Sequence, residues 1–248
     1  MGSRLLVPAI LLAAWFWTTS AGIVKSYQFA SPAAVLNEVT ALAQSGDLWA
    51  DVGISVERVA IGFAAALLCA LVLGTLVGSS RVAERALDPT LQALRAVPSL
   101  AWVPLLLLWL GIGEAAKITL VAIGGFFPIY VALVAGIRGV DRKLIEVARS
   151  LGLHGAALAL RVLVPATLPT LLVGMRIGLT QAWLFLVAAE LLGATSGLGF
   201  LLTDGQQTTR TDEILVAILL FALCGKLSET ALRALERRAV GWADTIQA

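Results

Sequence analysis

The chain has 248 residues, of which 59% are hydrophobic and 14% are charged, and its mean hydropathy is +0.91. About a quarter of the residues of a soluble globular protein are charged. A chain with so few charges cannot cover its surface with groups that water solvates. The composition therefore excludes a soluble enzyme, a nucleic-acid binder and a disordered protein, and the net charge of +2 indicates no partner. Cys69 and Cys224 lie in apolar runs and indicate small core residues, not a disulfide or a metal site.

Charge-free stretches predict six membrane spans and hence an all-α integral membrane protein. The first stretch contains the 20 residues between Arg4 and Lys25. At about 1.5 Å per residue, a helix of this length crosses a hydrocarbon core about 30 Å thick. The other five candidate spans are Val59 to Gly78, Ala96 to Gly113, Ile118 to Ile137, Leu168 to Gly193 and Ile214 to Leu232.

The first stretch also has a second interpretation. Arg4, the apolar run from Leu5 to Trp17 and the small residues Thr19 to Gly22 follow the three-part pattern of a cleaved signal peptide. We favour a retained span, since the rest of the chain is also embedded in the membrane. Residues 26 to 55 then form a mixed polar and apolar connection, in which Pro32 to Gln44 predicts a short surface helix.

Proline and glycine residues predict kinks and close packing in the third and fourth spans. Pro98 and Pro104 lie near and within the third, whereas Gly124-Gly125 and Pro128 lie in the fourth. In a membrane helix, neighbouring helices can satisfy the carbonyl groups that proline leaves unpaired. Small residues also let helix backbones approach closely.

Lysine and arginine residues indicate the orientation of the spans, because cytoplasmic loops are enriched in them. With the N-terminus inside, the inner segments hold 12 basic residues and the outer loops hold three. The inner residues are Arg4, Arg81, Arg85, Arg95, Arg138, Arg142, Lys143, Arg149, Arg161, Arg233, Arg237 and Arg238. The outer residues are Lys25, Lys117 and Arg210. Both termini are therefore expected in the cytoplasm.

The motifs of common catalytic sites are missing from the sequence. His154 is the single histidine, so no two-histidine zinc motif can form. Gly225-Lys226-Leu227 lacks the serine or threonine of a phosphate-binding loop. Gly193 and Gly199 stand at the wrong offsets from Ser196 for a hydrolase nucleophile elbow. The sequence predicts no enzyme, no metal site and no cofactor bound to this chain.

The connection between the fourth and fifth spans, residues 139 to 166, is patterned like an amphipathic helix. Asp141 is a candidate N-cap. An apolar face is predicted by residues at spacings i, i+3, i+4 and i+7, namely Leu144, Val147, Ala148 and Leu151. The opposite face is polar and consists of Arg142, Lys143, Glu146, Arg149 and Ser150.

The end of this helix is predicted at Gly152, where a left-handed cap costs glycine little. A second helical stretch, Ala156 to Val164, is expected to stop at Pro165. The pattern alone leaves two interpretations open. The helix either lies on the inner leaflet of the membrane or protrudes and docks into the groove of a partner protein.

Three parts of this segment, Glu146-Val147-Ala148, Gly152 and Val162-Leu163-Val164-Pro165, resemble the EAA-x3-G-x9-I-x-L-P motif of ABC importer permeases. The spacing matches throughout, and the departures are conservative. In that family the loop is a coupling helix, which lies in a cleft of the cytoplasmic ATPase and transmits its closure to the membrane spans. The coupling residues that this implies are Arg142, Glu146, Val147, Ala148, Arg149, Gly152, His154 and Pro165.

The resemblance extends from about Leu48 to Arg238. Over this range the chain is similar to the nitrate, sulfonate and taurine branch of these permeases. Its segments are Ala96-Val97-Pro98-Ser99-Leu100-Ala101-Trp102-Val103-Pro104, Gly111-Ile112-Gly113-Glu114, Phe126-Phe127-Pro128-Ile129-Tyr130 and Gly193-Ala194-Thr195-Ser196-Gly197-Leu198-Gly199. Aliphatic sulfonate permeases are the most similar group. Taurine, nitrate, bicarbonate and vitamin precursors are the alternative substrates within the branch.

The resemblance implies the type I ABC importer permease fold, in the inner membrane of a bacterium. Residues 1–50 would form an N-terminal transmembrane helix with a periplasmic connection, and residues 51–240 the permease domain. The implied partners are a second permease subunit, expected to be a copy of this chain, a cytoplasmic ABC ATPase dimer and a periplasmic or lipid-anchored substrate-binding protein. ATP and Mg would be used by the ATPase and not by this chain.

Charged residues inside spans cost about 2.5 to 3.5 kcal/mol at a helix centre, so they usually face a cavity or a partner. In the fifth span, helical geometry places Thr180, Trp183 and Glu190 within about 40° of Arg176. This face is the candidate translocation pathway, where Arg176 would suit an anion. Alternatively, Arg176 extends to the inner interface or pairs with Glu146 or Glu229, and Glu190 is structural.

Three other features have competing interpretations. Lys226 and Glu229, spaced i, i+3, are expected to pair with each other near the inner end of the sixth span. His154 is either a pH-sensitive contact to the ATPase or a neutral loop residue. The outer segment from Ala194 to Asp212 either docks a binding protein and forms an outer gate or is an ordinary solvated loop.

The rival classes are a self-sufficient ion-coupled carrier or channel and a purely structural membrane subunit. A carrier needs an acidic residue near the middle of the bilayer, and none lies centrally in the six candidate spans. A structural subunit would leave the patterned loop between the fourth and fifth spans unexplained.

Overall fold

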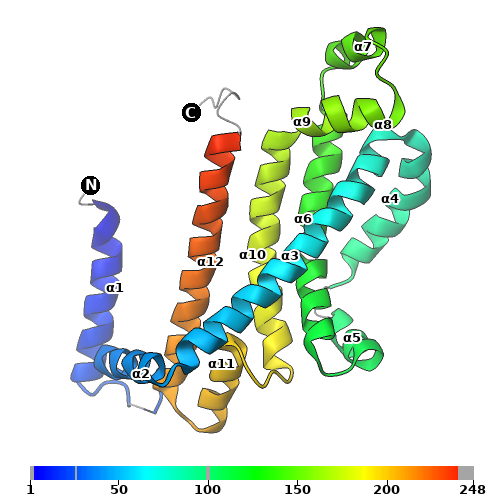
Figure 1. The fold of residues 1–248 in the computed structure, drawn as a ribbon. Helices are drawn as coiled ribbons and strands as arrows, with labels where there is room; N and C mark the ends of the chain where they lie inside the picture. Colours follow the sequence, from blue (N-terminus) through cyan, green and yellow to red (C-terminus); the bar gives the residue numbers. More distant parts are fainter. Residues whose placement is uncertain (1–2, 26, 99–100, 240–248) are drawn as a thin grey trace. The chain divides into compact units, whose positions relative to one another are not determined.

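The computed structural model describes residues 3–25, 27–98 and 101–239, and no β-strand occurs in these ranges (Figure 1). Ser99 and Leu100, in the predicted third span, and residue 240, the end of the predicted permease domain, lie outside the described residues. Contacts group the chain into two compact units. One comprises residues 1–56 and 190–224, and the other comprises residues 57–189 and 225–248.

In the unit of residues 57–189 and 225–248, α3 (Asp47–Ser79) packs parallel to α6 (Glu114–Arg138). A methyl group at Gly62 would lie 2.6 Å from Cγ1 of Val121, and one at Gly78 would lie 3.0 Å from Cβ of Ile137. Because both sequence numbers increase together along the contact, the two helices point the same way. Glycine permits this close approach.

A parallel pair requires the chain between the two helices to return along their whole length. Two shorter helices make this return, α4 (Arg81–Ala96) and α5 (Trp102–Leu110). Figure 1 shows α4 near the C-terminal end of α6 and α5 near its N-terminal end. The predicted third span, Ala96 to Gly113, is therefore wrong: α5 has nine residues, about 14 Å of helix, and is too short to cross alone. Pro98 lies between the two helices, where it interrupts the helical hydrogen bonding.

The helix α4 was not predicted, and its charges made it look like a loop. The side chain of Ser80 caps it by accepting a hydrogen bond from the backbone N–H of Ala83 at 3.3 Å. Glu84 pairs with Arg138 at 3.0 Å. The hydroxyl of Tyr130 donates a hydrogen bond to Asp88 at 2.7 Å. These charges are accommodated because α6 offers partners for them.

The helix α10 (Leu168–Leu191) packs antiparallel to α6. A methyl group at Gly136 would lie 3.0 Å from Cβ of Thr167, whereas one at Gly178 would lie 2.8 Å from the carbonyl oxygen of Gly125. The sequence numbers therefore run in opposite directions along this contact. The last part of α12 (Thr211–Ala239) follows α10, again antiparallel. The largest fully buried side chains of this unit include Tyr130, Leu120, Ile129, Leu133 and Leu186.

Four helices of the described chain are long and apolar enough to cross a membrane, namely α3, α6, α10 and α12. They cover the second, fourth, fifth and sixth predicted spans and confirm these as helices. The first predicted span is covered by α1 (Ser3–Ser20), a helix of 18 residues and about 27 Å. The prolines do not break the long helices, since Pro128 lies inside α6.

The unit of residues 1–56 and 190–224 contains α1, α2 (Pro32–Ser45) and α11 (Leu198–Gln207). The expected helix from Pro32 is confirmed: Ser31 caps α2 and Gly46 follows it with φ +91°. The indole N–H of Trp15 donates a hydrogen bond to the carbonyl of Ala30 at 3.0 Å. Val216 of α12 is fully buried in the same apolar cluster as Ala30. These contacts hold α1 and α2 to the N-terminal half of α12.

Candidate functional site

The segment that follows α6 forms the first candidate site. It consists of α7 (Arg142–Ser150), α8 (Gly155–Leu158), the π-helical turn η2 (Ala159–Leu163) and α9 (Val164–Ala166). Figure 1 shows the whole segment at the end of α6 away from α5, with α7 farthest out. A long apolar helix thus ends in a short polar one that projects beyond it.

Both ends of α7 are fixed by the residues that the sequence indicated. The carboxylate of Asp141 accepts a hydrogen bond from the backbone N–H of Lys143 at 2.9 Å and caps the start. Gly152 has φ +81°. Its N–H donates to the carbonyl of Arg149, and the N–H of Leu153 donates to the carbonyl of Ala148, both at 3.0 Å. This pair of hydrogen bonds is a Schellman cap, which glycine in the left-handed region permits.

The apolar face of α7 is mostly exposed to solvent in this chain. Ala148 is buried, with 4% of its surface accessible, and anchors α7 to the core of the unit. In contrast, Leu144 is 44%, Val147 58% and Leu151 76% exposed. These three large apolar side chains lie on the projecting helix α7 and form an apolar surface that nothing in this chain covers. We call these three residues the α7 stripe.

The other predicted coupling residues lie on the remaining faces of α7 and at its C-terminal cap. Arg142, Glu146 and Arg149 are exposed on α7. Nδ1 of His154 lies 3.0 Å from the carbonyl oxygen of Gly152, so the histidine ring lies on the cap of the helix. The helix α7 therefore carries an apolar face on one side and charged residues on the other.

The expected stop at Pro165 is wrong. The helical chain from Gly155 continues past Pro165 to Ala166. The π-helical turn directly before Pro165 explains this, because it shifts the hydrogen-bond register where proline has no N–H to donate. The bend comes instead at the buried Thr167, whose N–H bonds to the carbonyls of Leu163 and Val164 at 3.1 Å.

The four predicted pathway residues lie on α10 but do not share one open face. Arg176 is partly buried and pairs with Glu236 at 3.4 Å, not with Glu146 or Glu229. Thr180 is exposed. The indole N–H of Trp183 donates a hydrogen bond to the hydroxyl of Ser228 at 2.8 Å, and this tryptophan is buried. Of the four, only Thr180 is exposed, whereas Arg176 is half-buried and Trp183 and Glu190 are buried.

The exposed side of α10 is instead mostly apolar. Val173, Ile177 and Leu184 are 40%, 50% and 62% exposed, and Thr180 lies among them. Their spacing of four, three and four residues places all of them on one face of the helix. Arg176 lies at the edge of this face. The expected pairing of Lys226 with Glu229 is confirmed, at 3.2 Å.

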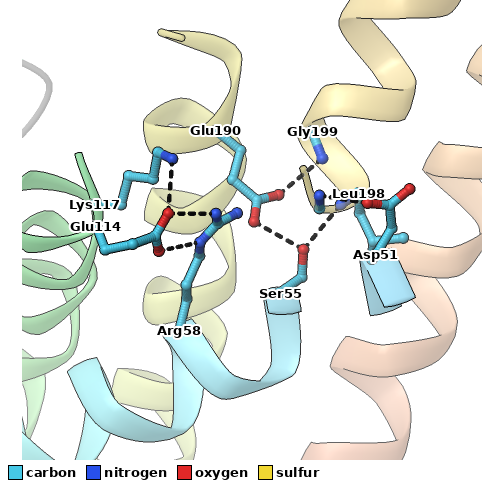
Figure 2. Close-up of polar contacts among 9 residues, drawn as sticks. Asp51, Ser55, Arg58, Glu114, Lys117, Glu190, Leu198 and Gly199 are labelled. Carbon is cyan, nitrogen blue, oxygen red and sulfur yellow. Dashed lines mark hydrogen bonds and ion pairs between the residues drawn. The ribbon is translucent and has the colours of Figure 1, made fainter. Parts of the chain in front are cut away.

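Glu190, the fourth pathway residue, belongs to a buried polar cluster that sequence reasoning missed (Figure 2). Its side chain is fully buried. One carboxylate oxygen accepts from the hydroxyl of Ser55 at 2.8 Å, and the other accepts from the N–H of Gly199 at 2.8 Å. The N–H of Leu198 donates to Ser55 at 2.9 Å, and that of Gly197 donates to Asp51 at 2.7 Å.

These acceptors satisfy the first N–H groups of α11, which have no partner within the helix. Negative carboxylates at a helix N-terminus are also favoured by its dipole. The sequence signal was the glycine-rich string Gly193 to Gly199. Gly197 has φ +105°, and a methyl group on Gly199 would overlap Cβ of Glu190. This geometry favours a structural role for Glu190.

A second charged cluster lies in the other unit (Figure 2). Glu114, at the start of α6, pairs with Arg58 of α3 at 2.6 Å and with Lys117 at 3.0 Å. Both cations are buried, which is costly without such a partner. In the sequence, the one indication of this cluster was Glu114, at the end of the string Gly111 to Glu114. The cluster locks the N-terminal end of α6 to α3.

The outer segment from Ala194 to Asp212 is only partly a loop, because α11 occupies Leu198–Gln207. After α11, Arg210 pairs with Glu38 of α2 and, at 3.3 Å, with Glu213 of α12. Arg210 thus connects α2 to the start of α12. Asp204, Gln206, Gln207 and Asp212 are further polar residues of this segment.

A family model described as "Binding-protein-dependent transport system inner membrane component" matches residues 62–241. The chain belongs to this family. The permease is therefore a multi-pass inner-membrane component of an ABC importer, which works with an ATPase and a substrate-binding protein, and it is not an enzyme.

Curated relatives align over nearly the whole permease. The putative aliphatic sulfonates transport permease protein SsuC of Bacillus subtilis is 41% identical and that of Escherichia coli 43% identical. These alignments cover 98% and 95% of this chain and 88% and 90% of the relatives. The taurine transport system permease protein TauC of Escherichia coli is 35% identical over 96% of this chain and 89% of its own length.

A solved structure supports the fold. An inward-facing conformation of the MetNI methionine ABC transporter matches with a TM-score of 0.61 and 20% sequence identity. The match covers 79% of this permease and 95% of that chain. The predicted type I ABC importer permease fold is therefore confirmed.

Proposed function

We propose that this permease imports a small organic anion into the cytoplasm and that an aliphatic sulfonate is its favoured substrate. The α7 stripe is the observation that supports the coupled mechanism. The substrate is supported by the relatives named for aliphatic sulfonates, at 41% and 43% identity, against 35% for the one named for taurine. Taurine, nitrate, bicarbonate and a vitamin precursor remain the alternative substrates.

The proposed role of α7 is to insert into a groove of each subunit of a cytoplasmic ABC ATPase dimer. Leu144, Val147 and Leu151 would bury their exposed surfaces there, which is a helix-in-groove mode of recognition. Glu146, which is exposed on α7 beside Val147, would lie at the charged rim. A partner protein explains the stripe better than the inner leaflet, because α7 projects farther from the end of α6 than α8 and α9 do (Figure 1).

The proposed orientation places α7 and both termini in the cytoplasm. Even without the three arginines of α4, which is a helix and not the predicted loop, the inner segments hold nine of the basic residues counted and the outer segments three. Under this orientation, the segment with α11 faces outward. There it would meet a periplasmic or lipid-anchored substrate-binding protein.

A second copy of the chain is the proposed partner within the membrane. The exposed face of α10, with Ile177, Thr180 and Leu184, has no cover in one chain. Facing the same surface of a second copy, it would line a pathway between the subunits. Arg176, at the edge of this face, would supply a positive charge for an anion if its ion pair with Glu236 opens.

The proposed cycle alternates between two states. Binding of ATP and Mg to the ATPase dimer would bring the two α7 helices together. Because α7 is anchored through Ala148 to the core formed by α3, α6 and α10, this movement would turn the long helices and open the pathway outward. Hydrolysis in the ATPase would reset the permease.

The test is uptake of a labelled alkanesulfonate by a deletion strain and by the same strain complemented with the gene. Uptake lost on deletion, restored by the gene and blocked only by unlabelled sulfonates supports both class and substrate. Blockage by taurine, nitrate or a pyrimidine instead would reassign the substrate. Complementation with Val147→Asp should fail, whereas Ser150→Asp, with the same charge on the polar face of α7, should restore uptake. Equal uptake by both variants would contradict the docking role of the stripe.

A further inference from the structure

A cavity of about 850 Å³ lies behind α7, within the unit of residues 57–189. It is lined by the last turns of α3, the end of α6, the inner side of α7 and the α8–α9 segment. Leu76, Leu160 and Val164 are among its mainly aliphatic lining residues. It is open along one side, where Leu76 is 49% and Leu160 65% exposed, so it suits a ligand that lies against the surface of the protein.

The charged side chains that line this cavity are all of one sign. Arg138, Arg142 and Arg149 line it, and no aspartate or glutamate does. Arg138 is paired with Glu84 outside the cavity. Arg142 and Arg149 are exposed at the edge of the cavity, and among the described residues no carboxylate pairs with them. An apolar interior with unpaired guanidinium groups fits a molecule with a hydrocarbon chain and an anionic head.

We propose that this cavity binds an anionic phospholipid of the inner leaflet. An acyl chain would lie along the aliphatic residues of α3 and α9, and the phosphate would accept hydrogen bonds from Arg142 and Arg149. Guanidinium groups bind phosphate oxygens with two parallel hydrogen bonds. Basic sites between helix ends on the cytoplasmic side are a known location for lipid head groups. The inner-leaflet location rests on the proposed orientation, but the binding itself does not.

The two faces of α7 make this site compatible with a docked ATPase. At about 100° per residue, Arg142, Ile145 and Arg149 lie on one side of the helix and the α7 stripe lies on the opposite side. The lipid therefore occupies the side toward α3 and leaves the stripe free. It would hold α7 against the ends of α3 and α6 and so fix the position from which the ATPase pulls.

Native mass spectrometry of the purified full chain in detergent tests the proposal, with phosphatidylglycerol or phosphatidylcholine titrated in. Each arginine near an anionic lipid contributes about 1 kcal/mol, so the double variant Arg142→Gln, Arg149→Gln should bind phosphatidylglycerol about 10- to 30-fold more weakly. Lys143→Gln is the matched control, because Lys143 lies on α7 outside the cavity lining. It should bind like the wild type.

A second variant keeps all the charges. Val72→Trp fills the cavity from α3, where Val72 lines it and is 60% exposed, and should also weaken phosphatidylglycerol binding at least 5-fold. Unchanged helical content in circular dichroism shows that the variants fold. Equal binding of the two lipids, wild-type affinity in the arginine double variant, or complete displacement by glycerol phosphate without a chain would each overturn the proposal. Lipid binding is measured without transport. A failure to bind lipid therefore does not contradict the proposed importer function, and a failure of alkanesulfonate uptake does not contradict lipid binding.

Discussion

Replacing Gly152 tests whether the cap of α7 transmits coupling. No atom lies within 4 Å of the position that a Cβ would take, so the substitution meets no steric clash. The cost comes only from the backbone, because φ is +81°, in the region that side chains with a Cβ disfavour. A residue held there costs about 1–3 kcal/mol, and a β-branched side chain falls at the upper end.

Unwinding the turn would relieve this strain at a similar cost. It breaks the hydrogen bonds from Gly152 to Arg149 and from Leu153 to Ala148, each with a net contribution of about 0.5–1.5 kcal/mol. Both routes reduce the population with a correctly placed α7. A penalty of about 1–3 kcal/mol corresponds to an apparent affinity for the ATPase that is up to about 5- to 150-fold weaker.

The assay is co-purification of the partner ATPase with Gly152→Val, Gly152→Ala and Gly152→Asn, together with uptake by cells that carry each variant. We expect Gly152→Val to lose most of the co-purified ATPase and of the uptake, Gly152→Ala to lose less, and Gly152→Asn to lose least. Asparagine enters the left-handed region more readily than the other two residues. The membrane level of each variant is the control for folding. Co-purification and uptake of Gly152→Val at wild-type levels would refute the role of this cap.

Three further predictions concern the buried contacts. Glu190→Ala removes the acceptor of the buried Ser55 hydroxyl and of the Gly199 N–H, and it should lower the unfolding free energy in detergent by about 2–5 kcal/mol. Glu190→Gln should be milder, and an unchanged unfolding midpoint for Glu190→Ala would contradict the cap of α11. Gly199→Ala should strongly reduce the membrane level of folded permease because its methyl group overlaps Glu190, whereas Gly53→Ala, in open space on α3, should be neutral; equal levels by immunoblot would refute this packing. Arg176→Gln should reduce anion uptake, whereas Glu236→Gln, which frees the guanidinium, should retain it; equal losses in the transport assay would show that the ion pair is only structural.

The sequence predicted those features best that depend on the residues of a single helix. The second, fourth, fifth and sixth spans are long apolar runs that have no alternative to a helix in lipid. The cap residues Asp141 and Gly152 and the stripe of α7 also act within a few residues of each other. These features follow from local spacing and were correct.

The wrong predictions concern residues whose free-energy cost in a helix depends on other parts of the structure. The helix α4 carries Glu84 and Asp88, which argued against a crossing until α6 supplied Arg138 and Tyr130 as partners. Pro165 stays in a helix because the π-helical turn before it removes the need for its N–H.

The buried clusters could not be predicted from spacing either. Ser55 and Glu190 are 135 positions apart, and Arg58 and Glu114 are 56 apart. Only the packed helices bring these groups together. The glycine-rich string before α11 indicated a turn, but not which carboxylate would receive the N–H groups at the start of that helix.

Reconstitution into liposomes tests the central claim most directly. Uptake of labelled alkanesulfonate is measured with the permease alone, and with the permease, its ATPase and its binding protein, each with and without ATP and Mg. The account predicts uptake only when all components and ATP are present, and loss of this uptake with Val147→Asp. Uptake by the permease alone, driven by an ion gradient and abolished by Asp88→Asn, would show an ion-coupled carrier and contradict the account.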